Sequence, residues 1–290
     1  MRVDPTRALP PQLIEQARRF EDAANKPAEP RNAASVILMR GSADLEVYLL
    51  VRHLGMAFAG GMVAFPGGGV DPRDAEDAAH WAGPTPAEWA SRLGVEPELA
   101  HSLVLAAIRE TFEESGVLLA GETADSVVAD TTGDDWEADR QALIDREQSL
   151  SEFLQRRELV ARTDLLVPWA CWLTPIFEPR RFRAWFFLAV LPEGQVTRDV
   201  STEASEVMWL DVREALARAH RDEFVMLPPQ YYTLLELLAA PSPTDAMALG
   251  RRREVELVMP AARFDGEVGY LEVPEQLVEL AARVVEEEGW

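Results

Sequence analysis

Three glutamates and one arginine crowd into the stretch AIRETFEESG: Arg109, Glu110, Glu113 and Glu114. On a helix, residues three and four apart project to one side, with Cβ atoms about 5–6 Å apart. Carboxylates gathered in this way repel one another, and Mg²⁺ relieves the repulsion because it accepts a few carboxylates and keeps its waters. Arg109 can orient a carboxylate through a charge-assisted hydrogen bond. A solvated acidic face is the alternative that the pattern alone leaves open.

A glycine-rich stretch upstream, AFPGGGVD, supplies a second element of interest. Glycine lets the backbone approach a ligand closely, and the N–H groups of a turn can cradle a phosphate. A plain β-turn is the alternative. Combined with a carboxylate helix that holds Mg²⁺, the loop predicts a device that grips a pyrophosphate and activates water against it.

A helix over PELAHSLVLAAIRETFEESG is expected to position the glutamates. Leu105, Ile108 and Phe112 recur on one face and point to a core, and Gly116 is a plausible stop for the helix. The apolar runs AASVILMR and LEVYLLVR, separated by GSAD, predict a β-hairpin before it. Strands are expected in LLVPWACWLTP and RAWFFLAVLP, and a strand followed by a helix with Asp211 as its N-cap in ASEVMWLDVREALARAH.

The remaining segments predict an extension at each end and two insertions. Residues 1–32 read as an N-terminal extension, 33–222 as the main domain and 223–290 as a C-terminal extension. The insertions are placed at about 72–99 and 121–165, the second with one helix through WEADRQALIDREQSLSEFLQRREL. The tail predicts a helix around PPQYYTLLELLAA, strands joined by an Asp-Gly turn, and a closing acidic helix.

Composition excludes several classes of protein. The chain has 290 residues, 48% of them hydrophobic, which is enough for a large core. Its net charge of −22 gives no basic footprint for nucleic acid, while bound cations would still allow a small anionic substrate. The single cysteine, Cys171, permits no intramolecular disulfide and reads as a buried, inert thiol. With no signal peptide or membrane-spanning run visible, we expect a soluble cytoplasmic protein.

The glutamate stretch and the glycine loop together resemble the Nudix hydrolase superfamily, whose signature box reads G-x5-E-x7-R-E-U-x-E-E-x-G-U, with U a bulky apolar residue. The second half of the box is complete from Arg109 to Val117, with Thr111 as a weak U. In the first half, roughly thirty extra residues separate the glycines from the helix. His101 stands eight places before the arginine, where the box has a glutamate. The fold implied is an α/β/α sandwich around a mixed sheet, with helical insertions and a C-terminal extension.

A box interrupted after FPGG resembles one branch of the superfamily, the peroxisomal and bacterial acyl-coenzyme A diphosphatases. The coenzyme A signature of the superfamily asks for two arginines, a glycine and FPGG. Arg52, Gly61 and the FPGG itself match, and Ala57 stands at the second arginine position. Further similarity runs through CWLTPIFEPRRFRAWFFLAVLPE, SEVMWLDVREAL and LPPQYYTLLELL.

The resemblance implies roles for individual residues. Ligands of Mg²⁺ or Mn²⁺ are expected at Glu110, Glu113, Glu114 and the backbone of Gly68, and Arg109 is expected to orient a box glutamate. The implied substrate contacts are Arg52, Gly61, Phe65, Pro66, Gly67, Gln230 and Tyr231. Glu203 and Glu206 are candidates for a further ligand or the general base, with a solvated residue before a strand as the alternative for either.

The implied reaction is hydrolysis of the pyrophosphate of coenzyme A or acyl-coenzyme A to (acyl-)phosphopantetheine and adenosine 3′,5′-bisphosphate. One alternative is a Nudix pyrophosphatase for another nucleoside diphosphate derivative: a sugar nucleotide, NAD(H) or ADP-ribose, a dinucleoside polyphosphate or a cap-like compound. Another is a non-catalytic Nudix-fold module that senses a nucleotide. The intact glutamates favour an enzyme. The oligomeric state is open, with a homodimer as one option.

Overall fold

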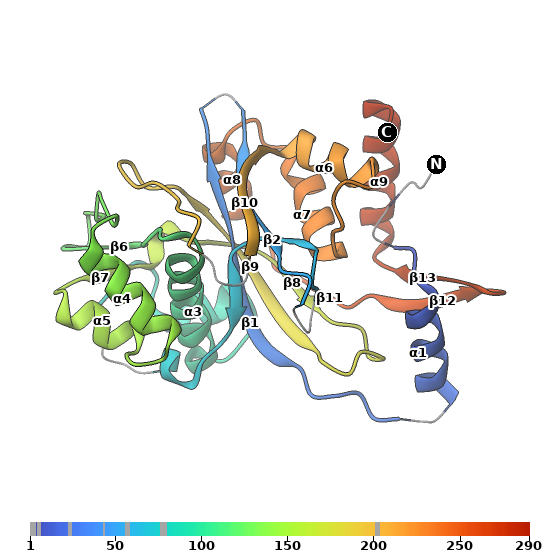
Figure 1. Cartoon of the computed structure of the whole chain (residues 1–290), viewed down its shortest axis with the longest axis horizontal. Helices are drawn as coiled ribbons and strands as arrows, with labels where there is room; N and C mark the ends of the chain where they lie inside the picture. The colour runs from blue at the N-terminus through green and yellow to red at the C-terminus, as the bar shows by residue number, and fades with distance from the viewer. Residues whose placement is uncertain are drawn as a thin grey trace.

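Helix α3 (Pro97–Ser115), which carries the glutamates, lies on one face of a central sheet. In the computed structural model, residue 4 and residues 7–22, 25–42, 44–55, 59–75, 80–200 and 204–290 are described. The opposite face of the sheet is covered by α6 (Val212–His220), α7 (Pro228–Leu237), α8 (Pro243–Gly250) and α9 (Glu275–Glu288) (Figure 1). The α/β/α sandwich expected from the sequence is therefore confirmed.

The central sheet is mixed, with the strand order β10-β2-β1-β9-β8-β11. Its strands are β1 (Arg31–Arg40), β2 (Glu46–Arg52), β8 (Val167–Leu173), β9 (Phe182–Val190), β10 (Ala204–Asp211) and β11 (Leu257–Val258), with β3 (Val63–Ala64) and β4 (Gly67–Gly69) beside them. β1 runs antiparallel to β2, as the predicted hairpin requires, and parallel to β9. Because side chains alternate along a strand, Val36 packs in the core around α3 while Ile37 packs in the core on the other face.

Helix α3 is buried almost all round, which is unusual for a helix with so many charges. Its predicted apolar face is confirmed, because Leu105, Ile108 and Phe112 are all buried in the core. The predicted stop is confirmed as well: Gly116 has φ 74° and its N–H donates to the carbonyl of Phe112 at 2.9 Å. The charged side chains must therefore find their partners inside the protein.

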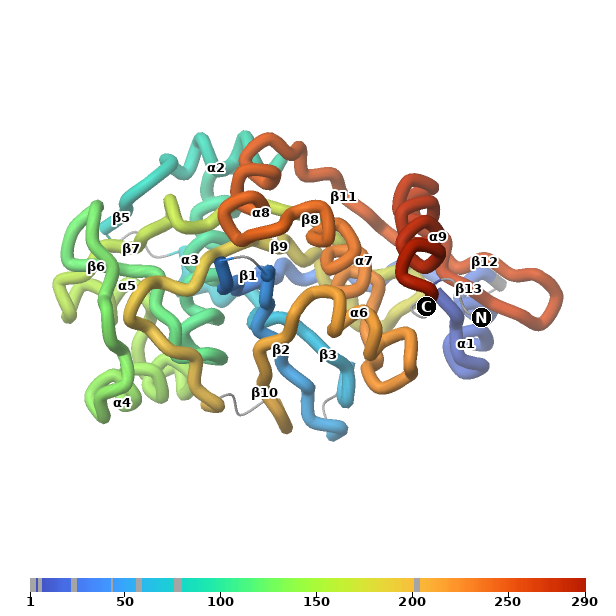
Figure 2. Tube along the Cα trace, turned by 90° about the horizontal axis from the view of Figure 1, so that it is seen from above, coloured from blue at the N-terminus to red at the C-terminus, as the bar shows by residue number. Residues whose placement is uncertain are grey.

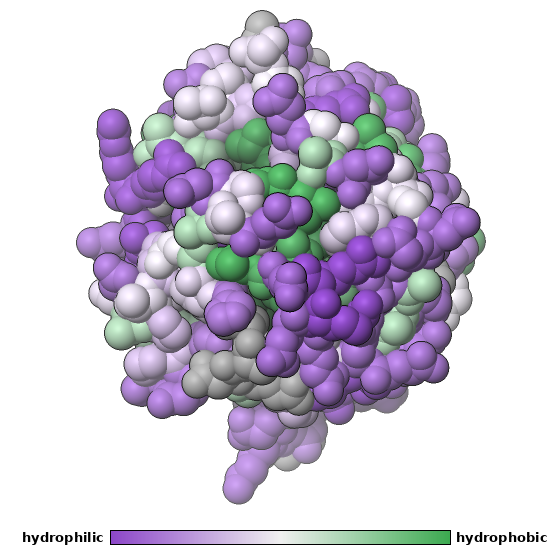
Figure 3. Space-filling model, turned by 90° about the vertical axis from the view of Figure 1, so that its left-hand side faces the viewer, coloured by the Kyte–Doolittle hydropathy of each residue, from purple (hydrophilic) through white to green (hydrophobic). Residues whose placement is uncertain are grey.

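The two insertions pair with each other. Strand β5 (His80–Ala82) of the first runs parallel to β7 (Val160–Arg162) of the second, which also pairs with β6 (Ala120–Gly121). Around them lie α2 (Pro86–Leu93), α4 (Asp134–Ile144), α5 (Leu150–Arg156) and the short η2 (Thr163–Leu165) (Figure 2). The expected single helix here is wrong, since Ser149 caps a new helix with a capping box. Seen from this end, the molecule is mainly hydrophilic around a central group of apolar atoms (Figure 3).

The ends of the chain meet in a small cluster of their own. Helix α1 (Pro11–Asp22) packs against the hairpin of β12 (Ala261–Asp265) and β13 (Val268–Glu272), whose Asp-Gly turn was predicted. Helix α8 was not predicted, although Ser242 caps it. None of the helices in the described ranges is both long and apolar enough to span a membrane. The division into extensions and a main domain stays a prediction.

Candidate active site

The guanidinium of Arg109 is the centre of the site, and only 8% of the residue is exposed. Its Nε and Nη2 donate to the two carboxylate oxygens of Asp74 at 2.9 and 3.0 Å, and Nη2 also donates to the carbonyl of Gly69 at 3.0 Å. Nη1 donates to Glu110 at 2.7 Å and to Glu113 at 3.2 Å. Burial lowers the pKa of Arg109. The neighbouring carboxylates together raise it by more, so that the net shift of this pKa is upward.

Asp74 supplies the acid of the first half of the Nudix box. It lies in the 3-10 turn η1 (Pro72–Ala75), is almost fully buried and grips Arg109 with both oxygens. Six positions after Gly68, it stands where G-x5-E asks for a carboxylate. His101, eight places before Arg109, stacks on Trp81 with ring centroids 5.1 Å apart. The signal in the sequence was the six-residue step from Gly68 to Asp74, which places this carboxylate at the beginning of the segment 72–99.

The glutamates of α3 lie directly against the glycine stretch. A Cβ on Gly68 would come within 2.6 Å of the carboxylate of Glu110, and the N–H of Gly67 donates to Glu114 at 2.7 Å. Burial raises the pKa of Glu110, an effect that Arg109 opposes and Glu113 reinforces. Burial likewise raises the pKa of Glu113. Glu110 and Glu114 thus contact the glycine strand, and Glu113 shares the guanidinium of Arg109 with Glu110.

The glycines form a strand. This corrects both predictions made for them, the phosphate-cradling turn and the plain β-turn. β4 pairs antiparallel with β1, with Gly68 opposite Ala34. A Cβ on Gly67 would lie 2.5 Å from the carbonyl of Ala34, so this residue must be glycine for β4 to pair so closely. The N–H of Gly67 is already used by Glu114. What the glycines provide is a close approach between β4 and α3.

The donor set fits a hard divalent cation. Carboxylate and carbonyl oxygens are the ligands that Mg²⁺ and similar ions prefer. A nearby cation stabilises the charged form of buried carboxylates whose pKa values burial has raised, and Arg109 acts in this way on both Glu110 and Glu113. Among the described residues, no three His, Cys, Asp or Glu side chains already form a metal cluster. Glu113 and Glu114 are instead engaged by Arg109 and by Gly67.

The residues of the coenzyme A signature form the hairpin that leads into β4. The N–H of Gly61 donates to the carbonyl of Arg52 at 2.9 Å, and the N–H of Arg52 donates to Met62 at 3.0 Å. These bonds close the β2–β3 hairpin, from which the chain continues through FPGG to the glutamates. Ala57, at the position of the second arginine, lies outside the described residues.

Three expected substrate contacts have structural positions instead. The Phe65 side chain is 2% exposed and packs on the sheet face opposite α3, and the carbonyl of Pro66 accepts from Val36 N at 2.8 Å. Tyr231 is fully buried on that same face, with its hydroxyl 2.9 Å from His220 Nε2. The three therefore anchor the loop and the core. Gln230 is half-buried at the start of α7.

The candidates for the general base are not assembled with the glutamates. Glu206 is exposed on β10, and because Val207 packs toward α3, the alternation of side chains turns Glu206 to the other face. Glu203 lies outside the described residues. A different carboxylate, Asp199, lies near the site: burial, and then the charges of Asp199 and Glu114, raise the pKa of Tyr48. No feature of the sequence singled it out.

Comparison with known proteins identifies the family. The chain matches the family model described as the NUDT19 Nudix domain over residues 90–237, slightly more than half of its length, and belongs to this Nudix family. A crystal structure of a NUDIX hydrolase from Alicyclobacillus acidocaldarius superimposes with a TM-score of 0.65 and 29% identity, covering 76% of this chain and 96% of that chain. The box helix lies inside the matched region, whereas Asp74 precedes it.

Curated relatives of this chain are longer than the region they share with it. A Caenorhabditis elegans protein named as a nudix hydrolase is 28% identical over 207 residues, covering 71% of this chain and 60% of that protein. The acyl-coenzyme A diphosphatase NUDT19 of Xenopus laevis is 26% identical over 236 residues, which cover 68% of this chain and 60% of the relative. The chain thus spans less than two thirds of the curated relatives it matches.

Adding one methyl group to the glycine strand tests the packing between β4 and α3. Gly68→Ala is expected to lower turnover about a hundredfold, because Glu110 must move aside. Its thermal midpoint is expected to fall as well, because the displaced carboxylate is buried and paired with Arg109. Gly69→Ala is the matched control, because no described atom lies within 4 Å of its new Cβ. Equal turnover in the two variants would contradict this placement of Glu110.

Separate substitutions of Asp74 and His101 test which of the two residues fills the position of the acid in the first half of the box. Asp74→Asn is expected to lower the free energy of unfolding by about 3 kcal/mol, because it removes the carboxylate that pairs with Nε and Nη2 of the buried guanidinium. Turnover is expected to fall at least tenfold with it. His101→Gln should cost less than about 1 kcal/mol. Urea denaturation and steady-state kinetics measure both effects, and a greater loss of turnover with His101→Gln would restore the original placement of the box acid.

Proposed function

We propose that the chain is a divalent-metal-dependent Nudix hydrolase that cleaves the pyrophosphate bond of coenzyme A or acyl-coenzyme A. The observation that carries the hydrolase assignment is the assembly of both halves of the box around Arg109, across the insertion that separates them. An intact set of buried glutamates beside a glycine strand favours catalysis over simple sensing of a nucleotide.

The chain's own residues position the reactants. Glu110, Glu113, Glu114 and the carbonyl of Gly68 would hold Mg²⁺ or Mn²⁺, which when bound neutralises phosphate charge and lowers the pKa of a bound water. Arg109 fixes Glu110 and Glu113 through Nη1. Their burial keeps bulk water from competing for these contacts, so each is stronger than it would be at a surface.

Two features support coenzyme A as the substrate. The relatives from Xenopus laevis and Gallus gallus are both named acyl-coenzyme A diphosphatase. In this chain, the Arg52–Gly61 hairpin continues directly into the strand that contacts the glutamates. Gln230 is a further candidate contact.

For the general base or a further ligand, Glu203 and Glu206 stay predictions. The homodimer, the cytoplasmic location and the exclusion of nucleic acid also stay predictions.

Product analysis tests the substrate. With coenzyme A or an acyl-coenzyme A and Mg²⁺, chromatography is expected to show adenosine 3′,5′-bisphosphate and the corresponding phosphopantetheine. Chelation of the metal should abolish both products, because the glutamates alone supply neither the water activation nor the charge neutralisation. Glu114→Gln, which removes one carboxylate charge, is expected to lower the rate at least a hundredfold.

A panel of other diphosphates completes that test. Cleavage of ADP-ribose, a sugar nucleotide or a dinucleoside polyphosphate without cleavage of coenzyme A would overturn the substrate and keep the hydrolase. Metal-independent binding of nucleotides with no turnover of any of them would overturn the hydrolase itself.

A further inference from the structure

The second insertion contacts the end of the helix that carries the glutamates. Its helix α4 lies beside α3 (Figure 1). Arg140 of α4 is only 2% exposed, and its Nη1 donates to the backbone carbonyl of Glu113 at 2.6 Å. Thr131, from the same insertion, donates its hydroxyl to the carbonyl of Gly116 at 2.6 Å. Two carbonyls at the end of α3 are therefore held by residues outside the box.

The bond from Arg140 satisfies an acceptor that α3 cannot satisfy by itself. The last four carbonyls of an α-helix have no partner within the helix, and a buried carbonyl without a partner is costly. The carbonyl of Glu113 is one of these four, and that of Ser115, which accepts from the N–H of Arg198 at 2.9 Å, is another. A cation at this end also interacts favourably with the helix dipole. The last turn of α3 is therefore completed by its neighbours.

The guanidinium of Arg140 is itself held in one orientation. Its Nε and Nη2 donate to the two carboxylate oxygens of Glu137, three residues earlier in α4, at 2.9 and 2.6 Å. A two-bond pair between an arginine and a carboxylate fixes the plane of the guanidinium. Glu137 also accepts from Nη1 of Arg198 at 3.0 Å. The donor that reaches α3 is thus oriented by α4 and by the loop before β10.

The same insertion also contacts the first half of the box. Arg73 of η1, the neighbour of Asp74, donates its Nη1 to the carbonyls of Arg146 and Gln148 at 3.0 and 3.2 Å. Both carbonyls lie in the turn between α4 and α5. One segment therefore holds two parts of the box that are far apart in the sequence.

We propose that the second insertion positions the glutamates that would bind the metal, and that Arg140 is the residue through which it does so. This inference rests on the proposed function. Arg140 acts as a positioning residue: it fixes the backbone at Glu113, and the side chains of Glu113 and Glu114 project from that turn. Residues that orient metal ligands from outside typically contribute about 10–100-fold to metal affinity or activity.

Titration of the full chain with Mn²⁺, followed by the electron paramagnetic resonance of the free ion, tests this inference. Arg140→Met removes the donor to Glu113 and keeps an unbranched apolar stem, so the affinity for Mn²⁺ is expected to fall about tenfold. At saturating metal, kcat for coenzyme A should fall while KM stays within about twofold, because Arg140 acts on the glutamates and not on the substrate. Arg140→Lys keeps a donor for the carbonyl and is expected to recover most of the loss.

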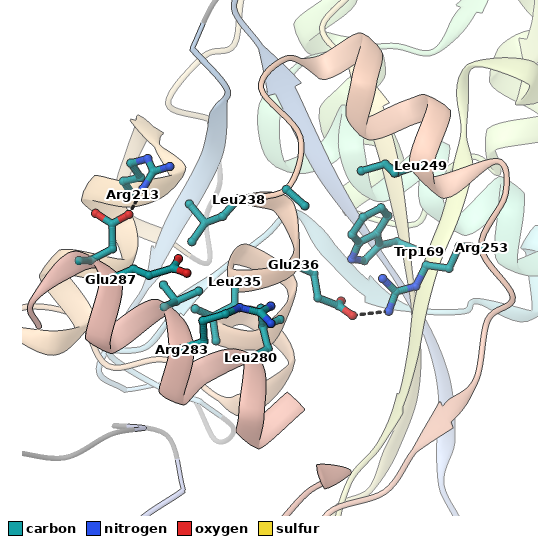
Figure 4. A pocket seen from close by; sticks show the side chains of 13 residues that line it. Trp169, Arg213, Leu235, Glu236, Leu238, Leu249, Arg253, Leu280, Arg283 and Glu287 are labelled. Atoms are coloured by element: carbon teal, nitrogen blue, oxygen red, sulfur yellow. Dashed lines mark hydrogen bonds and ion pairs between the residues drawn. The ribbon is translucent and has the colours of Figure 1, made fainter. Parts of the chain in front are cut away.

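Two control variants separate positioning from a general loss of stability. Asp139→Asn removes a buried carboxylate of α4 that pairs with Arg156 and Arg157, and should lower the unfolding midpoint without changing the affinity for Mn²⁺. Arg253→Met makes the same substitution in an arginine that pairs with Glu236 of α7 at 2.6 Å, on the opposite face of the sheet (Figure 4). It should also leave the affinity unchanged.

The inference is overturned if Arg140→Met binds Mn²⁺ as tightly as Asp139→Asn does, or if Arg140→Lys loses as much affinity as Arg140→Met. Should Arg140→Met fail to fold, Glu137→Gln makes the comparison at a side chain that is 40% exposed. It releases Arg140 from its two-bond pair and must then weaken Mn²⁺ binding relative to Asp139→Asn. A parent chain that binds no Mn²⁺ would overturn the proposed function and this inference together, whereas Mn²⁺ binding without any turnover would overturn the function alone.

Discussion

A buried guanidinium constrains the architecture around the site. Arg109 lies inside the protein, where an unpaired charge would be very costly, so each of its donors must have an acceptor. Those acceptors are far apart in the sequence: Gly69 and Asp74 lie before and at the beginning of the segment 72–99, and Glu110 and Glu113 follow it. The insertion can therefore vary in structure while its two ends remain tied to one side chain.

The same constraint explains the glycine strand. β4 lies between β1 and α3, and a side chain at Gly68 would occupy the space of the Glu110 carboxylate. Gathering several carboxylates at one buried point leaves them with raised pKa values, and therefore with a preference for a cation beside them. Arg109 satisfies part of that preference, and a divalent ion would satisfy the rest. Stability and proposed catalysis thus draw on the same charges.

Local signals in the sequence predicted much of the fold. Gly116 ended the helix as expected, and Asp211 capped the next one through its own side chain. The sequence did not point to Asp74 because the position of the box acid was counted eight residues back from Arg109. The spacing of the box is kept instead at its beginning, from Gly68 to Asp74. The burial of Phe65 and Tyr231 on the face opposite α3 could not be predicted, because a motif does not show which sheet face a side chain takes.

The central claim is that Arg109 and Asp74 act as one unit across the insertion, and a double-mutant cycle measures this directly. Arg109→Gln, Asp74→Asn and the double variant would be compared by the free energy of unfolding. A coupling of about 1–3 kcal/mol is expected, because the two-bond pair between Arg109 and Asp74 is lost already with the first substitution. Free energies that add to within about 0.5 kcal/mol would contradict it.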